Sequence, residues 1–263
     1  MLECVVNVSE GRRPAVLDAL TATAGGDLLD RHVDAHHHRS VFTLLGEEAP
    51  RRLATAAVEL IDLRRHQGVH PRLGAVDVVP FVALDGTPEA EALAARDRFV
   101  AWAAAELGLA AHAYGGDGPT LPAVRRGARR GLRPTAGPLL PHPTAGAVAV
   151  GARPVLVAYN VWLAAPDLSL ARSIAAGLRG PAVRALGLAV GREVQVSCNL
   201  VDPTVVGPAA VVDAVASSAP VARCELVGLL PAAVLAAVPE DRWQELDVAA
   251  DRTIEARLDR RGA

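Results

Sequence analysis

The chain of 263 residues contains no lysine, and all 27 of its basic residues are arginine. This excludes chemistry that needs a lysine amine, such as Schiff-base formation or a Gly-Lys-Ser/Thr phosphate loop. We attribute the all-arginine composition first to a bias towards GC-rich codons. The formal net charge is only −2. No strong field of one sign therefore favours nucleic acid or an acidic membrane as a partner.

Cysteine is also scarce, with only Cys4, Cys198 and Cys224, each in an apolar run. Such thiols are typical of buried, reduced cysteines, and we expect a cytoplasmic protein. The N-terminus lacks the features of a signal peptide, and no apolar run has transmembrane length. The hydrophobic fraction of 51% suffices for one large domain or two compact ones.

The apolar pattern predicts the same order of elements, β-α-β-β-α-β, in each half of the chain. Predicted strands cover 2–8, 28–34, 41–45 and 75–84, then 154–162, 183–190, 193–201 and 221–229. The order is that of the ferredoxin-like motif. We therefore predict an α+β fold with two ferredoxin-like subdomains, residues 1–151 and 152–263. Facing sheets would leave a substrate cleft or tunnel between them. Two unrelated α+β halves are the alternative.

Two segments between or after these elements are harder to interpret. Residues 131–151 are rich in Pro, Gly and Thr and are predicted to be an ordered connector over the active surface. Residues 242–258 are predicted to form a charged amphipathic helix on the outside. The glycines of 115–118 suggest a tight turn.

The segment from His66 to Asp77 joins a predicted helix to a Val-rich strand. Pro71 fixes one backbone angle and biases His70 away from the helical region, and Gly74 permits a close backbone approach. His70 and Arg72 are therefore expected at the mouth of a sheet, where α/β proteins bind ligands. A surface turn with a solvated histidine is the alternative.

Asp34 ends one predicted strand and Arg39 begins the next. If these strands neighbour the one after His70, the side chains converge at one end of the sheet. An aspartate beside a histidine orients the ring as a general base, and an arginine can bind a carboxylate through two hydrogen bonds. A turn-forming aspartate and surface arginines are the competing interpretation.

The run His36-His37-His38 suggests a metal site, with His32, His66 and His70 as further ligands. Adjacent residues of an extended segment point to opposite faces, and zinc-type cysteine pairs and His-Glu-x-x-His are missing. We expect no metal and interpret the run as a solvated or substrate-facing turn. In the second half, strand alternation turns four polar residues towards a groove, or leaves them as ordinary edge polarity. These are Asn160, Ser197, Asn199 and Glu225.

Several segments together resemble the glutamate formiminotransferase family, over almost the whole chain and in order. The start, Glu3-Cys4-Val5-Val6-Asn7-Val8-Ser9-Glu10-Gly11, is similar to the family's Glu-Cys-Val-Pro-Asn-Phe-Ser-Glu-Gly. The resemblance continues at Asp34, at Arg39-Ser40-Val41, from His66 to Asp77, and at 120–125, 146–153, 159–160, 195–200 and 225–229.

The resemblance implies a dimeric enzyme that moves a formimino group from N-formimino-L-glutamate to N5 of tetrahydrofolate, its co-substrate, in histidine degradation. It implies His70 as the catalytic base, Asp34 as its supporting carboxylate and Arg72 as an adjacent binding residue. Further substrate-binding residues are predicted on both halves: Asn7, His38, Arg39, Gly74, Asn160, Ser197, Asn199 and Glu225. Neither nucleic acid nor a membrane is expected as a partner.

Four residues differ from the family's usual pattern. Val69 stands in place of Glu, His38 in place of Asn, Thr135 in place of Asp and Glu225 in place of Gln. These differences leave three alternatives open. They are a relative with another amidine donor or acceptor amine, a folate-type binder without turnover, and a metal-dependent enzyme that uses the histidine turn.

Overall fold

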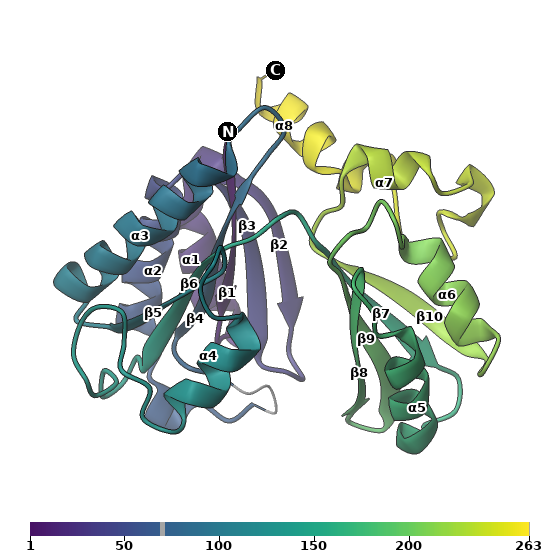
Figure 1. Cartoon of the computed structure of the whole chain (residues 1–263), viewed down its shortest axis with the longest axis horizontal. Helices are drawn as coiled ribbons and strands as arrows, with labels where there is room; N and C mark the ends of the chain where they lie inside the picture. Colours follow the sequence, from purple (N-terminus) through teal and green to yellow (C-terminus); the bar gives the residue numbers. More distant parts are fainter. Residues whose placement is uncertain (69–71, 263) are drawn as a thin grey trace. The chain divides into compact units, whose positions relative to one another are not determined.

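The structure, a computed structural model, describes residues 1–68 and 72–262. The chain divides after Pro154 into two compact units, and each has its own sheet and hydrophobic core (Figure 1). The mixed α+β class predicted from the sequence is thereby confirmed. The sequence placed the boundary between its two subdomains after Gly151.

The first unit contains a six-stranded sheet with the order β2-β3-β1-β4-β6-β5. Neighbouring strands among β1 to β4 are antiparallel, whereas β6 runs parallel to both β4 and β5. The strands are β1 (Leu2–Val8), β2 (Leu28–Asp34), β3 (Arg39–Leu45), β4 (Val76–Ala83), β5 (Ala110–Tyr114) and β6 (Ala147–Ala152).

Most helices of the first unit pack against one face of this sheet. They are α1 (Pro14–Ala24), α2 (Glu48–Leu60) and α3 (Glu89–Glu106), with short 3₁₀ turns η1 (Gly25–Asp27) and η2 (Leu63–Arg65). Helix α4 (Leu121–Ala128) instead packs through Val124 against Val78, Tyr114 and Ala149. Thr120 caps its N-terminus, since the Thr120 hydroxyl accepts a hydrogen bond from the backbone N–H of Ala123.

The prediction that residues 131–151 form only a connector is wrong, because Ala147–Ala152 is the strand β6 inside the sheet. A strand paired on both sides and covered on both faces is apolar throughout, so it shows no alternation. Its small residues also weakened the strand signal in the sequence. One of them, Gly151, is required by packing, because a side chain there would overlap the ring of Tyr114. Thr135 holds the preceding loop to β5 by accepting a hydrogen bond from the amide of Ala113.

The second unit has an antiparallel sheet with the order β10-β7-β9-β8. Its elements are β7 (Val157–Leu163), α5 (Leu168–Leu178), β8 (Val183–Val190), β9 (Glu193–Leu200), α6 (Pro208–Ala216), β10 (Val221–Val227) and α7 (Ala232–Ala236). Alternate residues of the strands, such as Tyr159 and Val196, pack in the core under the helices. Their neighbours along each strand face away from this core.

The predicted helix over 242–258 is also wrong. The chain there forms the 3₁₀ turns η3 (Glu240–Arg242) and η4 (Ala250–Arg252), and α8 begins only at Ile254 and ends at Gly262. Asp247, with φ of 52°, interrupts the helical path, and its carboxylate accepts a hydrogen bond from the amide of Leu226. Arg252 donates to the carbonyl of the same residue, so this segment is tied to the end of β10.

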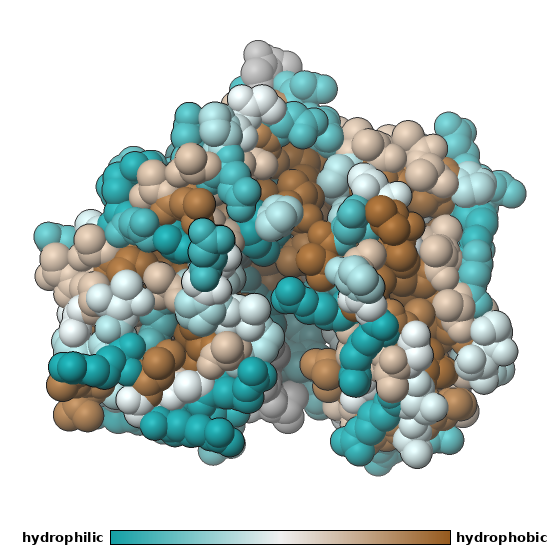
Figure 2. All heavy atoms as spheres, viewed as in Figure 1, coloured by the Kyte–Doolittle hydropathy of each residue, from teal (hydrophilic) through white to brown (hydrophobic). Residues whose placement is uncertain are grey.

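All three cysteines are free and buried, as the sequence predicted. Among the helices of the described residues, none combines the length and apolar character needed to span a bilayer. On the visible face of the first unit, hydrophilic and hydrophobic side chains are interspersed (Figure 2).

Candidate active site

Four strand ends lie together at one end of the first sheet. Val8, at the end of β1, pairs with Ser40 near the start of β3 and with Val76 at the start of β4. Asp34, at the end of β2, pairs with Arg39 at the start of β3. The segments that follow β1 and β2 and those that precede β3 and β4 therefore reach one region of the unit. We call this region, residues 7–13, 34–40, 66–68 and 72–77, the strand-end site.

His70, the predicted base, lies outside the described residues, together with Val69 and Pro71. The residues that flank it are held by specific contacts. Arg72 donates a hydrogen bond of 2.9 Å to the carbonyl of His66. Ser9 donates one of 2.8 Å to the carbonyl of Gly74, whose own α-carbon lies so close to the backbone of Ala147 that any side chain would overlap it. Both ends of this loop are thus anchored at the strand-end site.

Among the described residues, Asp34 contacts His37 rather than the loop around His66. Its Oδ1 accepts a hydrogen bond of 2.8 Å from the backbone amide of His37, and its Oδ2 lies 2.5 Å from the Nδ1 of that ring. Burial raises the pKa of Asp34, but these hydrogen bonds outweigh it and lower the pKa to about 2. The carboxylate is therefore ionised at neutral pH. The sequence predicted a solvated or substrate-facing turn for His37 and not its contact with Asp34, although an Asp three residues before a His across a turn was a usable signal.

Arg39 and Asn7 are paired on the sheet face opposite helices α1 to α3, where the side-chain oxygen Oδ1 of Asn7 accepts a hydrogen bond from the guanidinium. Burial lowers the pKa of Arg39, and the nearby Asp77 carboxylate opposes that shift. Asp77 is itself buried and accepts hydrogen bonds from the Leu73 amide (2.6 Å) and from Arg125 (2.5 Å). Asp77 and Arg125 were not predicted as site residues. A buried acid at the start of a Val-rich strand was the available signal.

Glu10 organises the turn that follows β1. Its side chain is fully buried, and one oxygen accepts hydrogen bonds of 2.8–3.0 Å from the amides of Gly11, Arg12 and Arg13. Its other oxygen pairs with the Arg13 guanidinium at 2.6 Å. Burial raises the pKa of Glu10, but these donors lower it more. Glu10 therefore fixes the direction in which the side chains of Arg12 and Arg13 leave the turn.

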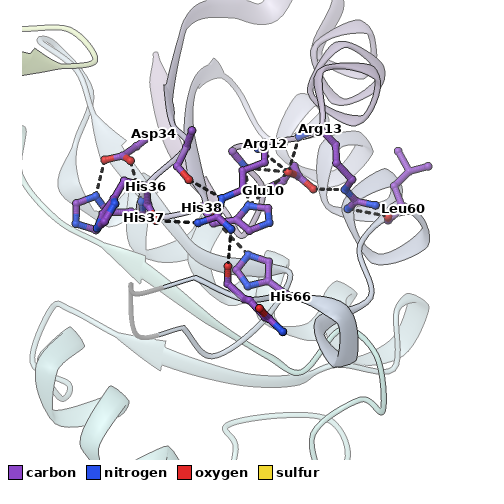
Figure 3. Close-up of polar contacts among 12 residues, drawn as sticks. Glu10, Arg12, Arg13, Asp34, His36, His37, His38, Leu60 and His66 are labelled. Carbon is purple, nitrogen blue, oxygen red and sulfur yellow. Dashed lines mark hydrogen bonds and ion pairs between the residues drawn. The ribbon is translucent and has the colours of Figure 1, made fainter. Parts of the chain in front are cut away.

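His38 packs against His66 in the stacked arrangement of Figure 3, with ring centroids 4.0 Å apart. The Nδ1 of His38 accepts a hydrogen bond of 3.0 Å from the Gly11 amide, and the Nε2 of His66 lies 3.1 Å from the carbonyl of His38. Burial, and then the neighbouring His66, lower the pKa of His38 to about 4. The ring is neutral at pH 7. This predicted substrate-binding residue therefore joins two segments of the strand-end site.

The predicted residues of the second unit share the sheet face turned away from its helices. The amide of Asn160 and the indole of Trp162 both donate to one oxygen of Glu225, at 3.0 and 3.1 Å. Ser197 pairs with Asn160 across β7 and β9, and Asn199 follows on the same face. The guanidinium of Arg223 lies 3.7 Å above the Trp162 ring. These contacts all lie within the second unit, and the strand-end site lies within the first.

Among the described residues, neither site contains a metal centre. Within residues 1–68 and 72–262, no group of three or more His, Cys, Asp or Glu side chains is arranged to hold a metal ion. The histidines of the turn after β2 point to different partners: His37 lies against Asp34, and His38 lies against His66. His36 meets the His37 ring edge to face.

Comparison with known proteins shows the family of this chain. Residues 1–153 match the family described as the formiminotransferase domain, N-terminal subdomain. A protein of Streptococcus pyogenes named glutamate formimidoyltransferase is 40% identical over 204 residues, which cover 68% of each chain. A protein of the same name from Thermoplasma acidophilum is 31% identical over 68% of this chain and 67% of its own.

The formimidoyltransferase-cyclodeaminase of the pig is 34% identical over 272 residues. That match covers 88% of this chain but only 50% of the pig protein, so the chain spans about half of that relative. The chain belongs to the formiminotransferase family, and it is therefore a transferase, as the resemblance of its motifs indicated.

Proposed function

We propose that this protein transfers a formimino group from N-formimino-L-glutamate to N5 of tetrahydrofolate. The observation that carries the proposal is the 40% identity, over 68% of each chain, to a protein named glutamate formimidoyltransferase. The strand-end site supports it, because it combines an ionised Asp34 with arginines that suit the carboxylates of both substrates. A homodimer and a cytoplasmic location belong to the same proposal.

The reaction needs a group that accepts and then donates a proton. The secondary amine N5 attacks the amidine carbon of the donor and must lose its proton as the tetrahedral adduct forms. The glutamate nitrogen must gain a proton before the C–N bond breaks. We assign both transfers to His70, with Asp34 as supporting carboxylate and Arg72 as a substrate-binding residue. The chemistry needs neither a metal nor a covalent intermediate.

The proposal also includes the arrangement of the molecule. We propose that both units are ferredoxin-like and that their open sheet faces enclose the folate. The support is that β1 to β4 and β7 to β10 follow one strand order in their sheets, and that each open face carries polar residues. Asn7 and Arg39 then belong to one wall, and Asn160, Ser197, Asn199 and Glu225 to the other.

The direct test incubates the purified protein with formiminoglutamate and tetrahydrofolate and follows 5-formiminotetrahydrofolate. We expect turnover in the wild type and a loss of about 10²- to 10⁴-fold in His70→Ala, since general acid–base catalysis contributes that much. Circular dichroism shows whether the variant is folded. Folate binding without turnover would favour a binding protein, and neither binding nor turnover would favour another amidine donor or acceptor.

A further inference from the structure

Arg12 lies at the junction of two segments that are far apart in the sequence. Its Nε donates a hydrogen bond of 2.7 Å to the carbonyl of Ala35, and its Nη2 donates one of 3.2 Å to the carbonyl of His36. Its Nη1 donates one of 2.9 Å to the carbonyl of Gln67. One guanidinium thus joins the turn between β2 and β3 to the loop that leads to His70 (Figure 3).

The geometry of the arginine head group explains this bridging. A guanidinium presents five N–H donors in a fixed plane, and three of its nitrogens are used here on three carbonyls. These carbonyls lie in turns outside the strand ladders, so they need partners from elsewhere. Glu10 orients Arg12, because its carboxylate accepts a hydrogen bond of 2.8 Å from the backbone amide of Arg12.

Direct packing shows that the two segments meet beneath this bridge. A side chain on Gly68 would approach the carbonyl of His37 to 2.8 Å and the Cβ of His38 to 2.9 Å. The stacked rings of His38 and His66 form the adjoining contact. The junction leaves no room for a side chain at Gly68, and a small separation of the segments would break several contacts together.

We infer that Arg12 is a positioning residue: its guanidinium couples the turn that follows Asp34 to the loop that precedes His70. It acts through these backbone carbonyls and needs no contact with substrate. This inference rests on the proposed function for its effect on catalysis. The coupling of the two segments can be measured without any reaction.

The test compares Arg12→Met with Arg65→Met. The control removes an arginine close to the same loop, but that side chain is 90% exposed and, among the described residues, its ion pair is with Asp62, at 4.0 Å. Amide hydrogen exchange, measured by NMR, is followed at His37 and His66, whose amides are hydrogen-bonded to Asp34 and Leu63. We expect exchange about 10-fold faster at both amides in Arg12→Met, since the loss of one hydrogen bond changes the equilibrium constant for local opening about 5- to 10-fold. In Arg65→Met we expect no change.

The kinetic test measures kcat and KM for both substrates. We expect kcat of Arg12→Met to fall about 10- to 100-fold with KM nearly unchanged, because a small misplacement of reacting groups costs that much. Arg12→Lys keeps the charge but cannot span three carbonyls, so it should remain impaired. Full activity in Arg12→Lys, or a rise in KM alone, would overturn the inference in favour of a charge or binding role.

The two measurements separate the possible failures. If the wild type transfers no formimino group, the proposed function fails, whereas faster exchange at both amides in Arg12→Met still supports the coupling. If exchange at both amides stays at the wild-type rate, the inference is wrong whatever the activity. Faster exchange at His37 alone would also overturn it, because the coupling requires that the loop responds.

Discussion

His38 adopts a left-handed backbone conformation, with φ of 54°, that residues other than glycine take uncommonly and in which asparagine, aspartate and histidine are enriched. The surrounding contacts stabilise it there: the Gly11 amide donates to its ring, and His66 stacks on its face. By resemblance, the family usually has asparagine at this position. Asparagine tolerates the same conformation and also offers an acceptor, so both residues fit one structural requirement.

The lowered pKa of His38 has a consequence for stability. Its folded-state pKa of about 4 lies below the ordinary value of 6.5, so the unfolded chain takes up a proton first as the pH falls. The free energy of unfolding must therefore decrease from about pH 6.5 to about pH 4. His66, whose pKa is also lowered by burial, contributes in the same direction. Asp34, with a pKa of about 2, loses its contribution only below about pH 4.

We predict that His38→Asn folds at pH 7 and has a flatter dependence of stability on pH between 6.5 and 4. The slope should fall by at most about 1.4 kcal/mol per pH unit, the value for one proton. His66 keeps its share, so some slope persists. Urea unfolding at a series of pH values measures this. A slope equal to that of the wild type would show that His38 is not the titrating group.

At the scale of elements, helix α5 lies unusually close to strand β8. A side chain on Gly187 would overlap backbone atoms of Ala171 and Arg172 in the helix. The close approach lets Ala171 and Ile174 reach the core of the second unit. A backbone cannot yield as a flexible side chain does, so the helix must shift if this glycine is replaced.

We predict that Gly187→Ala destabilises the protein by about 1–3 kcal/mol, the usual cost of overpacking. Gly177→Ala on α5 is the matched control, since nothing lies within 4 Å of its added Cβ. Alanine is the better helix former, so the control should gain up to about 1 kcal/mol. Thermal unfolding measures both. Equal effects of the two substitutions would contradict the close packing of α5 on β8.

At the scale of the whole molecule, each unit, as far as its residues are described, has its own core and a sheet face turned away from the helices of that core, and the proposed function needs both of these faces. Ser197 lies half-buried on the open face of the second unit, paired with Asn160. Ser173 lies exposed on helix α5, on the other side of the same sheet. The two serines therefore allow one substitution to be compared on the two sides.

We predict that Ser197→Trp weakens binding of tetrahydrofolate at least about 10-fold, the effect of losing about 1.4 kcal/mol, and that Ser173→Trp leaves it unchanged. Under the proposed arrangement, a bulky ring on this face would fill the space assigned to the pterin. Isothermal titration calorimetry measures the affinity. Unchanged affinity in folded Ser197→Trp would mean that the second unit does not line the folate site.

Much of the fold could be predicted from local patterns. Strand alternation in β7, β9 and β10, and the start of α1 at Pro14, depend on neighbouring residues, so the sequence carries them directly. Strand β6 could not be predicted, because its burial on both faces depends on partners from β4 and β5. The break at Asp247 likewise depends on a hydrogen bond to β10.

Residue types and their spacing along the chain were enough to predict the β-α-β-β-α-β order within each half, the buried cysteines and the family that the motifs resemble. Which polar groups meet depended on strand pairing and packing in three dimensions. Glu10, His37, Asp77 and Arg12 act through hydrogen bonds whose partners depend on how β1 to β4 pair. Hydrogen bonds are directional and short, so spacing along the chain cannot reveal them until strand pairing has fixed the register.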